Sequence, residues 1–103
     1  MTTSHAVPVR IHVHGNVPDY AGDLAIIKVS SVLARHVAES VISARVVLTM
    51  APDPAVVRPA IAEATVGISG RMVRARAAGQ TMRTAIGLMT DRLRIRLDRT
   101  ARF

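Results

Sequence analysis

The chain has 103 residues, a formal net charge of +7, 50% hydrophobic residues and no cysteine. This length suits one domain with a single hydrophobic core, and the lack of cysteine excludes disulfides, thiolate metal sites and a cysteine nucleophile. Its only aromatic residues are Tyr20 and Phe103, which excludes a platform of several aromatic rings for stacking bases.

The start of the chain does not resemble a secretory signal. Residues 1–8 lack the basic end and apolar run of such a segment, and no stretch approaches the roughly 18 uninterrupted apolar residues of a membrane span. We expect a flexible tail over residues 1–8 and a single cytoplasmic domain over residues 9–103, with no membrane partner.

The first half of the chain predicts a strand and a helix. Residues 9–14 alternate as a half-buried strand does, with an apolar side of Val9, Ile11 and Val13 and a polar side of Arg10, His12 and His14. After a loop, Asp23 is expected to cap a helix that runs to about Ser40. Its predicted packing stripe is Ile26, Val29, Leu33 and Val37, and its predicted exposed stripe is Lys28, Ser31 and Arg35.

Three further strands are predicted from alternation and from turn residues. They cover residues 43–50, 60–69 and 72–78. The first ends where Pro52 and Pro54 remove backbone donors, and Ser69-Gly70 predicts a tight hairpin between the other two. Arg74 and Arg76 are expected on the polar side of the last strand.

A final helix is predicted from Met82 onward, with Thr81 as its cap. Its packing stripe is formed by Met82, Ile86, Met89, Leu93 and Leu97, with Ala85 alongside. The order is therefore β-α-β-β-β-α. Because the strands have one apolar side and each helix one apolar stripe, we expect an α+β two-layer sandwich: a four-stranded sheet with two helices on one face.

The positive charge is concentrated in the last third of the chain. Residues 71–103 hold nine arginines and only two acids, Asp91 and Asp98, whereas residues 1–70 are neutral overall. A basic helix held in place by an apolar stripe suits a polyanion, because each phosphate that is neutralised releases condensed counterions.

A family resemblance is carried mainly by the last helix. There Met82, Ala85-Ile86, Arg92-Leu93, Leu97 and Arg99 follow the pattern of the ribosome hibernation promoting factor family, also called protein Y or ribosome-associated inhibitor. The resemblance extends over residues 9–102 and includes a first strand that ends in His-Gly. The chain departs from the family at Gly79-Gln80-Thr81 and at Gly87, where the family carries acids, and at Arg83, where it carries an aromatic residue.

The resemblance implies a fold similar to that of a double-stranded-RNA-binding domain and a role in ribosome hibernation. The expected partners are the small ribosomal subunit and its rRNA, in the decoding region, where the protein would block the mRNA and tRNA sites and inhibit translation during stress or dormancy. The family also has long members with a C-terminal domain that pairs two ribosomes. This chain corresponds either to a short form or to the N-terminal piece of a long one.

The candidate rRNA contacts are exposed cations. One row is formed by Arg92, Arg96 and Arg99, which have i, i+4, i+7 spacing. An ordinary solvated helix face would pair such cations with acids, but only two acids, Asp91 and Asp98, are available here. If the helices pack side by side, the stripe of Lys28 and Arg35 can join this row. The candidates are Lys28, Arg35, Arg74, Arg76, Arg83, Arg92, Arg94, Arg96 and Arg99, of which Arg83 and Arg94 project from another side of the helix.

The remaining polar residues leave other interpretations open. Arg74 and Arg76, with Arg10, His12 and His14 nearby, either bind a second RNA segment or guard an exposed sheet. His12 and His14 lack a third metal ligand, and no catalytic motif is present, so we expect no metal, no cofactor, no small-molecule substrate and no enzyme activity. Two alternative functions are a generic double-stranded-RNA-binding module and a protein-interaction module that docks an acidic partner.

Overall fold

The elements follow one another in the predicted order. The computed structural model describes residues 9–36, 41–53, 55–68 and 70–101. They form β1 (Val9–His14), α1 (Tyr20–His36), β2 (Val41–Met50), β3 (Ala60–Ile68), β4 (Arg71–Gly79) and α2 (Met82–Ala101), which confirms the β-α-β-β-β-α fold class. The predicted tail, the helix end near Ser40, the packing residue Val37 and the hairpin residue Ser69 lie outside the described residues.

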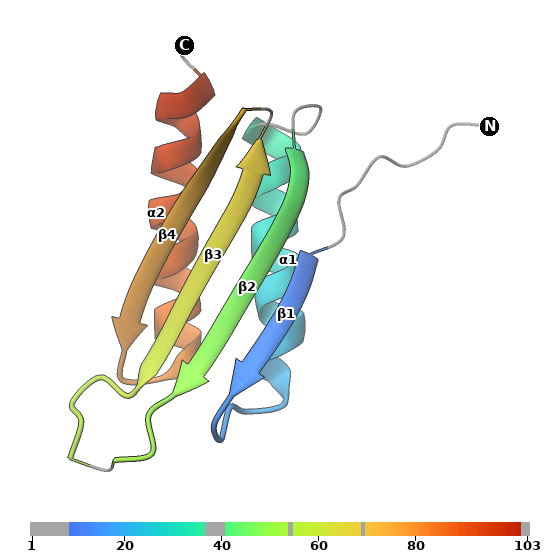
Figure 1. Ribbon diagram of the computed structural model, residues 1–103. Helices are drawn as coiled ribbons and strands as arrows, with labels where there is room; N and C mark the ends of the chain where they lie inside the picture. The colour runs from blue at the N-terminus through green and yellow to red at the C-terminus, as the bar shows by residue number, and fades with distance from the viewer. Residues whose placement is uncertain (1–8, 37–40, 54, 69, 102–103) are drawn as a thin grey trace.

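The four strands form one mixed sheet in the order β1-β2-β3-β4. β1 runs parallel to β2, and the other neighbours are antiparallel. Parallel neighbours need a crossover connection, which α1 supplies. Both helices lie on the same face of the sheet, with α1 behind β1 and β2 and α2 behind β3 and β4 (Figure 1). The opposite face of the sheet is not covered by any described element.

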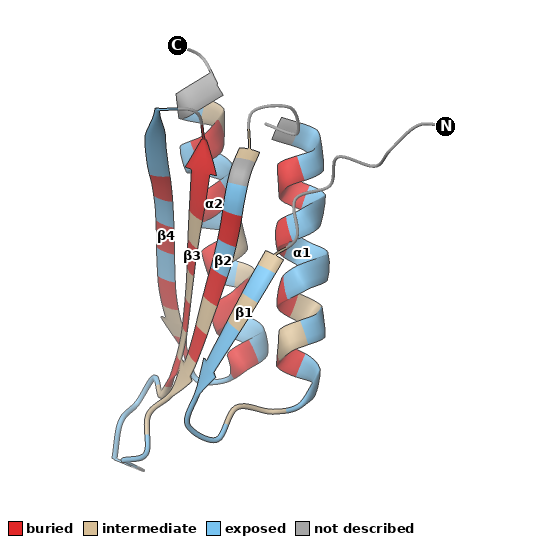
Figure 2. Cartoon of the chain, turned by 45° about the vertical axis from the view of Figure 1, so that its right-hand side comes forward, coloured by how far each residue is buried: buried red, intermediate tan, exposed pale blue. Residues whose placement is uncertain are grey.

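Alanine is the commonest buried residue on the side of the sheet that faces the helices. Alternate residues of β2, β3 and β4 are buried, as predicted (Figure 2). Among them are Ala44, Ala60, Ala62, Ala64, Ala75 and Ala77. Since alanine projects little beyond the backbone, the sheet forms a shallow floor, and the large side chains of the core come mainly from the helices.

The packing stripe of α2 is the one predicted. Met82, Ala85, Ile86, Met89, Leu93 and Leu97 are each at most 1% exposed. Thr81 caps the helix, because its Oγ1 accepts a hydrogen bond of 3.2 Å from the backbone N–H of Thr84. The cap fixes where α2 starts, and the buried stripe fixes its rotation about its own axis.

The first helix differs from its prediction in two respects. It begins at Tyr20, three residues before Asp23, and Asp23 lies in its first turn. A turn closed by a 3.1 Å hydrogen bond from Ala21 N–H to the Pro18 carbonyl leads into it. The stripe that faces the sheet is Ala21, Ala25, Val29, Val32 and Leu33, and Ile26 is exposed. Ile26 was misplaced because small alanines, which carry a weak hydrophobic signal, occupy the buried positions of the first turns.

Two glycines are needed at the ends of strands. Gly15, which follows β1, has φ +83°, and a Cβ there would collide with the backbone carbonyl of Met50 at the end of β2. Gly70, between β3 and β4, has φ +82° and faces open space. Positive φ is easily reached only by glycine, so these two residues fix the turns at opposite ends of the sheet.

Val13, predicted on the apolar side of β1, is half exposed because β1 is an edge strand with only β2 beside it.

Candidate nucleic-acid interface

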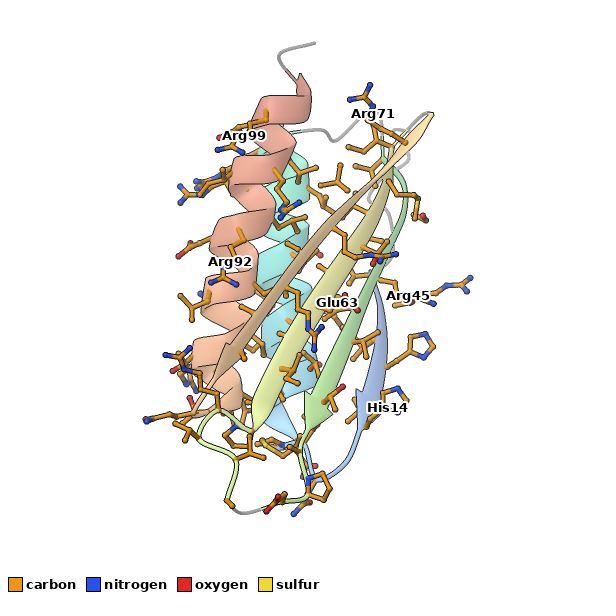
Figure 3. The ribbon with its side chains drawn as sticks, turned by 60° about the vertical axis from the view of Figure 1, so that its left-hand side comes forward. His14, Arg45, Glu63, Arg71, Arg92 and Arg99 are labelled. Carbon is orange, nitrogen blue, oxygen red and sulfur yellow. The ribbon has the colours of Figure 1, made fainter. Side chains whose placement is uncertain are left out.

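The predicted arginine row of α2 lies beside the edge of the sheet. Because the buried stripe points at the floor of alanines, Arg92, Arg96 and Arg99 emerge on the side of α2 that borders β4. Arg92 and Arg99 can be followed along this side in Figure 3. All three side chains are exposed. The prediction that they form one row is confirmed in geometry.

This row forms one wall of an open groove of about 560 Å³ between α2 and β4. The lining residues are Met72, Val73, Arg74, Arg92, Ile95, Arg96 and Arg99. The groove thus brings four arginines together from two elements, and Met72 and Ile95 are its exposed apolar lining residues. A cleft that combines several guanidinium groups suits phosphate, since each can donate two parallel hydrogen bonds to phosphate oxygens.

Arg92 also links the two walls of the groove. Its guanidinium Nη1 donates a 2.7 Å hydrogen bond to the backbone carbonyl of Arg76. β4 is an edge strand, so no neighbouring strand offers this carbonyl a backbone N–H to accept a hydrogen bond from. Arginine carries five N–H donors, and the contact uses one of them. Arg92 is therefore held in position while keeping donors for a ligand.

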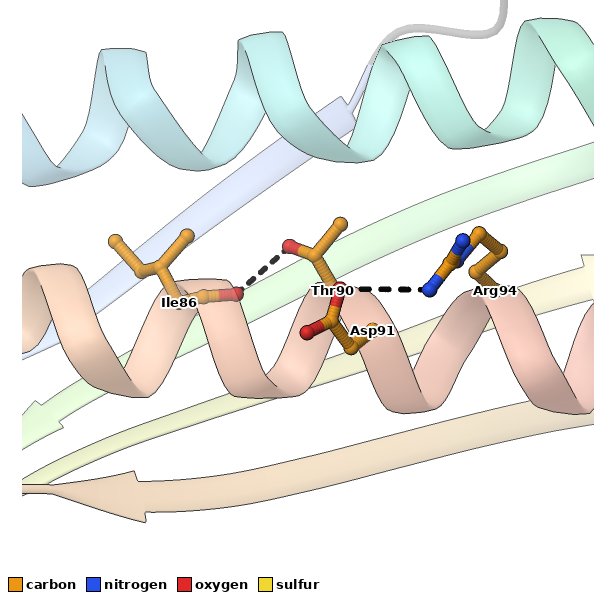
Figure 4. Close-up of polar contacts among 4 residues, drawn as sticks. All are labelled: Ile86, Thr90, Asp91 and Arg94. Atoms are coloured by element: carbon orange, nitrogen blue, oxygen red, sulfur yellow. Dashed lines mark hydrogen bonds and ion pairs between the residues drawn. The ribbon is translucent and has the colours of Figure 1, made fainter.

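Two predicted site residues lie away from the groove. Arg94 is paired with Asp91 at 3.8 Å, an exposed contact one helical turn apart (Figure 4). Arg83 lies over the ring of Tyr20, with its guanidinium carbon 5.1 Å from the ring centroid. This contact joins the start of α2 to the start of α1. The prediction that Arg83 and Arg94 project from another side of the helix is confirmed. The same view shows the Thr90 hydroxyl donating to the Ile86 carbonyl within α2 at 2.7 Å.

The predicted union of the two helical basic stripes is wrong in its geometry. Lys28 and Arg35 are exposed on α1, as expected. The groove, however, is lined only by residues of α2 and β4, and the side of α2 that meets α1 carries Arg83. The arginine row therefore continues onto β4. The reason is rotational: the buried stripe of α2 turns the row toward the outer edge of the sheet.

The open face of the sheet holds the remaining predicted cations. Arg74 and Arg76 are exposed there, as are Arg10, His12 and His14. The expectation that these two groups are close neighbours is wrong, because β4 and β1 are opposite edges of the sheet. Arg45 on β2 lies between them and was missed as a candidate. Its signal was present, because in residues 43–50 Arg45 alternates with Ala44, Val46 and Leu48 and so falls on the opposite side of the strand.

The described part of the chain also bears on other kinds of site. There, no cluster of three or more histidine, cysteine or acidic side chains could hold a metal ion. Among the residues whose burial the structure describes, no polar or charged side chain is buried. Neither helix, over its described length, has the run of apolar residues needed to cross a membrane.

Comparisons with known proteins agree with the fold. The structure of a ribosomal subunit interface protein from Coxiella burnetii is similar, with a TM-score of 0.72 and 14% sequence identity, covering 92% of this chain and 98% of that one. The N-terminal domain of Protein Y from Thermus thermophilus is similar with a TM-score of 0.73 and 24% identity, covering 91% and 99%.

Comparisons of sequence give one match and one negative result. A search of curated proteins finds no match to the chain. The family model described as Sigma 54 modulation protein / S30EA ribosomal protein matches residues 7–102. That match covers nearly the whole chain, including both helices and all four described strands. The chain therefore belongs to the Sigma 54 modulation protein / S30EA ribosomal protein family.

Proposed function

We propose that the protein is a ribosome hibernation factor that binds the decoding region of the small ribosomal subunit through rRNA phosphates. There it blocks the mRNA and tRNA sites and inhibits translation during stress or dormancy. Membership of a ribosomal protein family supports a ribosomal partner, and that partner implies a cytoplasmic protein. The observation that carries the proposal is the groove in which Arg74, Arg92, Arg96 and Arg99 come together.

The proposed mechanism is occupancy without turnover. Guanidinium groups on two rigid elements contact phosphates, and the folded domain fills space that mRNA and tRNA would use. Backbone contacts of this kind fix position and carry no sequence information, which suits a partner recognised by its shape. The groove is the primary contact. Lys28, Arg35, Arg76, Arg83 and Arg94 are exposed outside its lining and are assigned to secondary rRNA contacts.

Sedimentation with purified small subunits tests the proposal. At low salt the protein should migrate with the subunit, and the double variant Arg96→Gln/Arg99→Gln should migrate less. The matched control is Arg58→Gln/Arg71→Gln, which removes the same charge from exposed positions outside the groove. A wild-type protein that stays at the top of the gradient contradicts the proposal.

Competition separates this function from the two alternatives. A generic double-stranded-RNA binder would be displaced from subunits by plain duplex RNA at comparable concentration, whereas a hibernation factor would prefer the subunit. A protein-interaction module would keep its partner after nuclease treatment. Inhibition of translation is then measured as reduced binding of mRNA and initiator tRNA to subunits that were loaded with the protein first.

A further inference from the structure

The uncovered face of the sheet carries a line of residues that crosses all four strands and has a cation on three of them. Arg10 on β1 is the register partner of Arg45 on β2, Arg45 is the partner of Thr65 on β3, and Thr65 is the partner of Arg74 on β4. Register partners have side chains on the same face of a sheet. These four residues therefore form one line perpendicular to the strands. We call Arg10, Arg45 and Arg74 the transverse row.

The transverse row is exposed and has no acidic neighbour in line. All three arginines are exposed, and in Figure 3 Arg45 points away from the helices. Thr65, the remaining member of the line, is uncharged. Within the described part of the chain, no carboxylate forms an ion pair with a row arginine. The row next to it differs, because there Arg76 has Glu63 as its register partner.

Such a line is unfavourable for the folded protein alone. Like charges on directly opposite residues of neighbouring strands destabilise a sheet, and Arg10 and Arg45 are such a pair. A local arrangement that disfavours folding, and in which no described carboxylate lies directly opposite a row arginine, points to a ligand that supplies negative charge. The row spans three strand spacings, about 14 Å, which exceeds what one small anion can bridge.

The row is also continuous with the groove. Arg74 belongs to both, since it lines the groove beside α2 and ends the row on β4. A polyanion that leaves the groove over the edge of β4 therefore meets Arg45 and then Arg10. The described strands offer no phenyl, phenol or indole ring for stacking bases, because β1 to β4 contain no Phe, Tyr or Trp.

We infer that the transverse row is a second contact for an RNA sugar-phosphate backbone, reached from the groove around the edge of β4. The inference rests on the proposed function and extends it: the domain contacts RNA with two faces. The helical side with its groove makes one contact, and the open sheet makes the other. A domain held in this way sits between two RNA segments, or inside the bend of one.

Tethered cleavage distinguishes the two contacts. The chain has no cysteine, so Thr65→Cys places a single thiol in the middle of the row and Ile95→Cys places one in the groove. Each variant is coupled to an iron chelate that generates hydroxyl radicals and is bound to small subunits, with the cysteine-free wild type as background. We expect both positions to cut rRNA, at different nucleotides.

Three other outcomes each overturn a defined statement. Cuts from Ile95→Cys but none from Thr65→Cys overturn the transverse row as a contact and leave the proposed function intact. An absence of cuts from both positions overturns the proposed function and this inference with it. Cuts from both positions at the same nucleotides overturn the assignment of two separate contacts.

Salt dependence gives an independent measurement. The double variant Arg10→Gln/Arg45→Gln should lower the slope of log affinity against log salt by about 1.4 to 1.8, at 0.7 to 0.9 for each lost phosphate contact. Arg58→Gln/Arg71→Gln, with the same change of charge away from the row, should keep the wild-type slope. Equal slopes for the two variants overturn the inference. A row variant that loses only polyglutamate binding also overturns it, in favour of an acidic protein partner.

Discussion

Arg92 of α2 donates a 2.7 Å hydrogen bond to the backbone carbonyl of Arg76 on β4, so a residue of the groove also closes the free edge of the sheet. Long cationic side chains on a surface usually cost conformational entropy when a ligand orders them. Arg92 has already lost much of that freedom in the folded protein. The contact therefore couples the stability of the domain to the geometry of its candidate binding site.

Replacement of Arg92 is expected to destabilise the fold. Arg92→Ala should lower the free energy of unfolding by about 1 kcal/mol, because the edge carbonyl exchanges a charged donor for water. Arg99→Ala removes the same charge from the same helix without such a bond and should change stability by less than about 0.5 kcal/mol. Urea unfolding measures both. Equal effects would show that the bond to Arg76 contributes nothing to stability.

Two arginines of α2 should differ in binding. Arg99→Gln removes a cation of the groove and should lower the salt slope for small subunits by about 0.7 to 0.9. Arg94→Gln removes a cation that lies outside the groove and is already paired with Asp91, so the decrease should be smaller. Affinities for the small subunit, measured at salt concentrations from about 50 to about 200 mM, test this difference. An equal decrease would mean that total charge, and not the groove, governs binding.

The packing stripe of α2 should dominate stability. Leu93 is fully buried, so Leu93→Ala should lower the free energy of unfolding by about 2 to 5 kcal/mol through lost apolar contact and a residual cavity. Ile95, two residues further on, is 47% exposed, and Ile95→Ala should have an effect below about 1 kcal/mol. Chemical unfolding gives both values. A small loss at Leu93 would contradict the observed rotation of the helix.

The two positive-φ glycines should respond differently to alanine. Gly70→Ala meets open space and should cost about 1 to 2 kcal/mol, which is the conformational penalty alone. Gly15→Ala has the same φ but also places a Cβ against the Met50 carbonyl, so its cost should be larger, on the order of 3 kcal/mol. Thermal unfolding of the two variants ranks them, and the reverse order would contradict the close approach of β1 and β2.

The cap of α2 can be tested by a pair of substitutions at Thr81. Thr81→Ala removes the oxygen that accepts from Thr84 N–H and should cost about 1 kcal/mol. Thr81→Asp keeps an acceptor and adds negative charge at the start of a helix whose first turn has no acid, so stability should be retained or raised. Loss of stability in the aspartate variant as well would indicate that the threonine acts through packing.

The sequence predicted the features that depend on local periodicity. The stripe of α2, with Leu93 and Leu97 buried, follows from helical spacing of large apolar residues, and the alternation of β3 follows from the pleat of a strand. The cap at Thr81 could be predicted because its chemistry is local too. Elements of this kind carry their own signal, so their order and type needed no knowledge of the neighbours.

What the sequence did not predict depends on contacts between elements. Nothing local in residues 9–14 states that β1 pairs in parallel with β2, and this pairing separates Arg10 from Arg74 by the width of the sheet. The direction in which Arg92, Arg96 and Arg99 point depends on the rotation of α2 about its own axis as it packs against the sheet. The missed candidate, Arg45, gains its meaning only from register, which places it between two other arginines.

The alanine floor connects the interior of the protein to its surface. Ala75 and Ala77 of β4 are buried on the side of the sheet that α2 covers. Small side chains at these positions let the helix axis come close to the strand, and that closeness lets Arg92 reach the Arg76 carbonyl. A valine in place of either alanine would push α2 away from β4 and widen the groove between them. The width of the candidate groove on the surface is thus set in part by two small side chains in the interior.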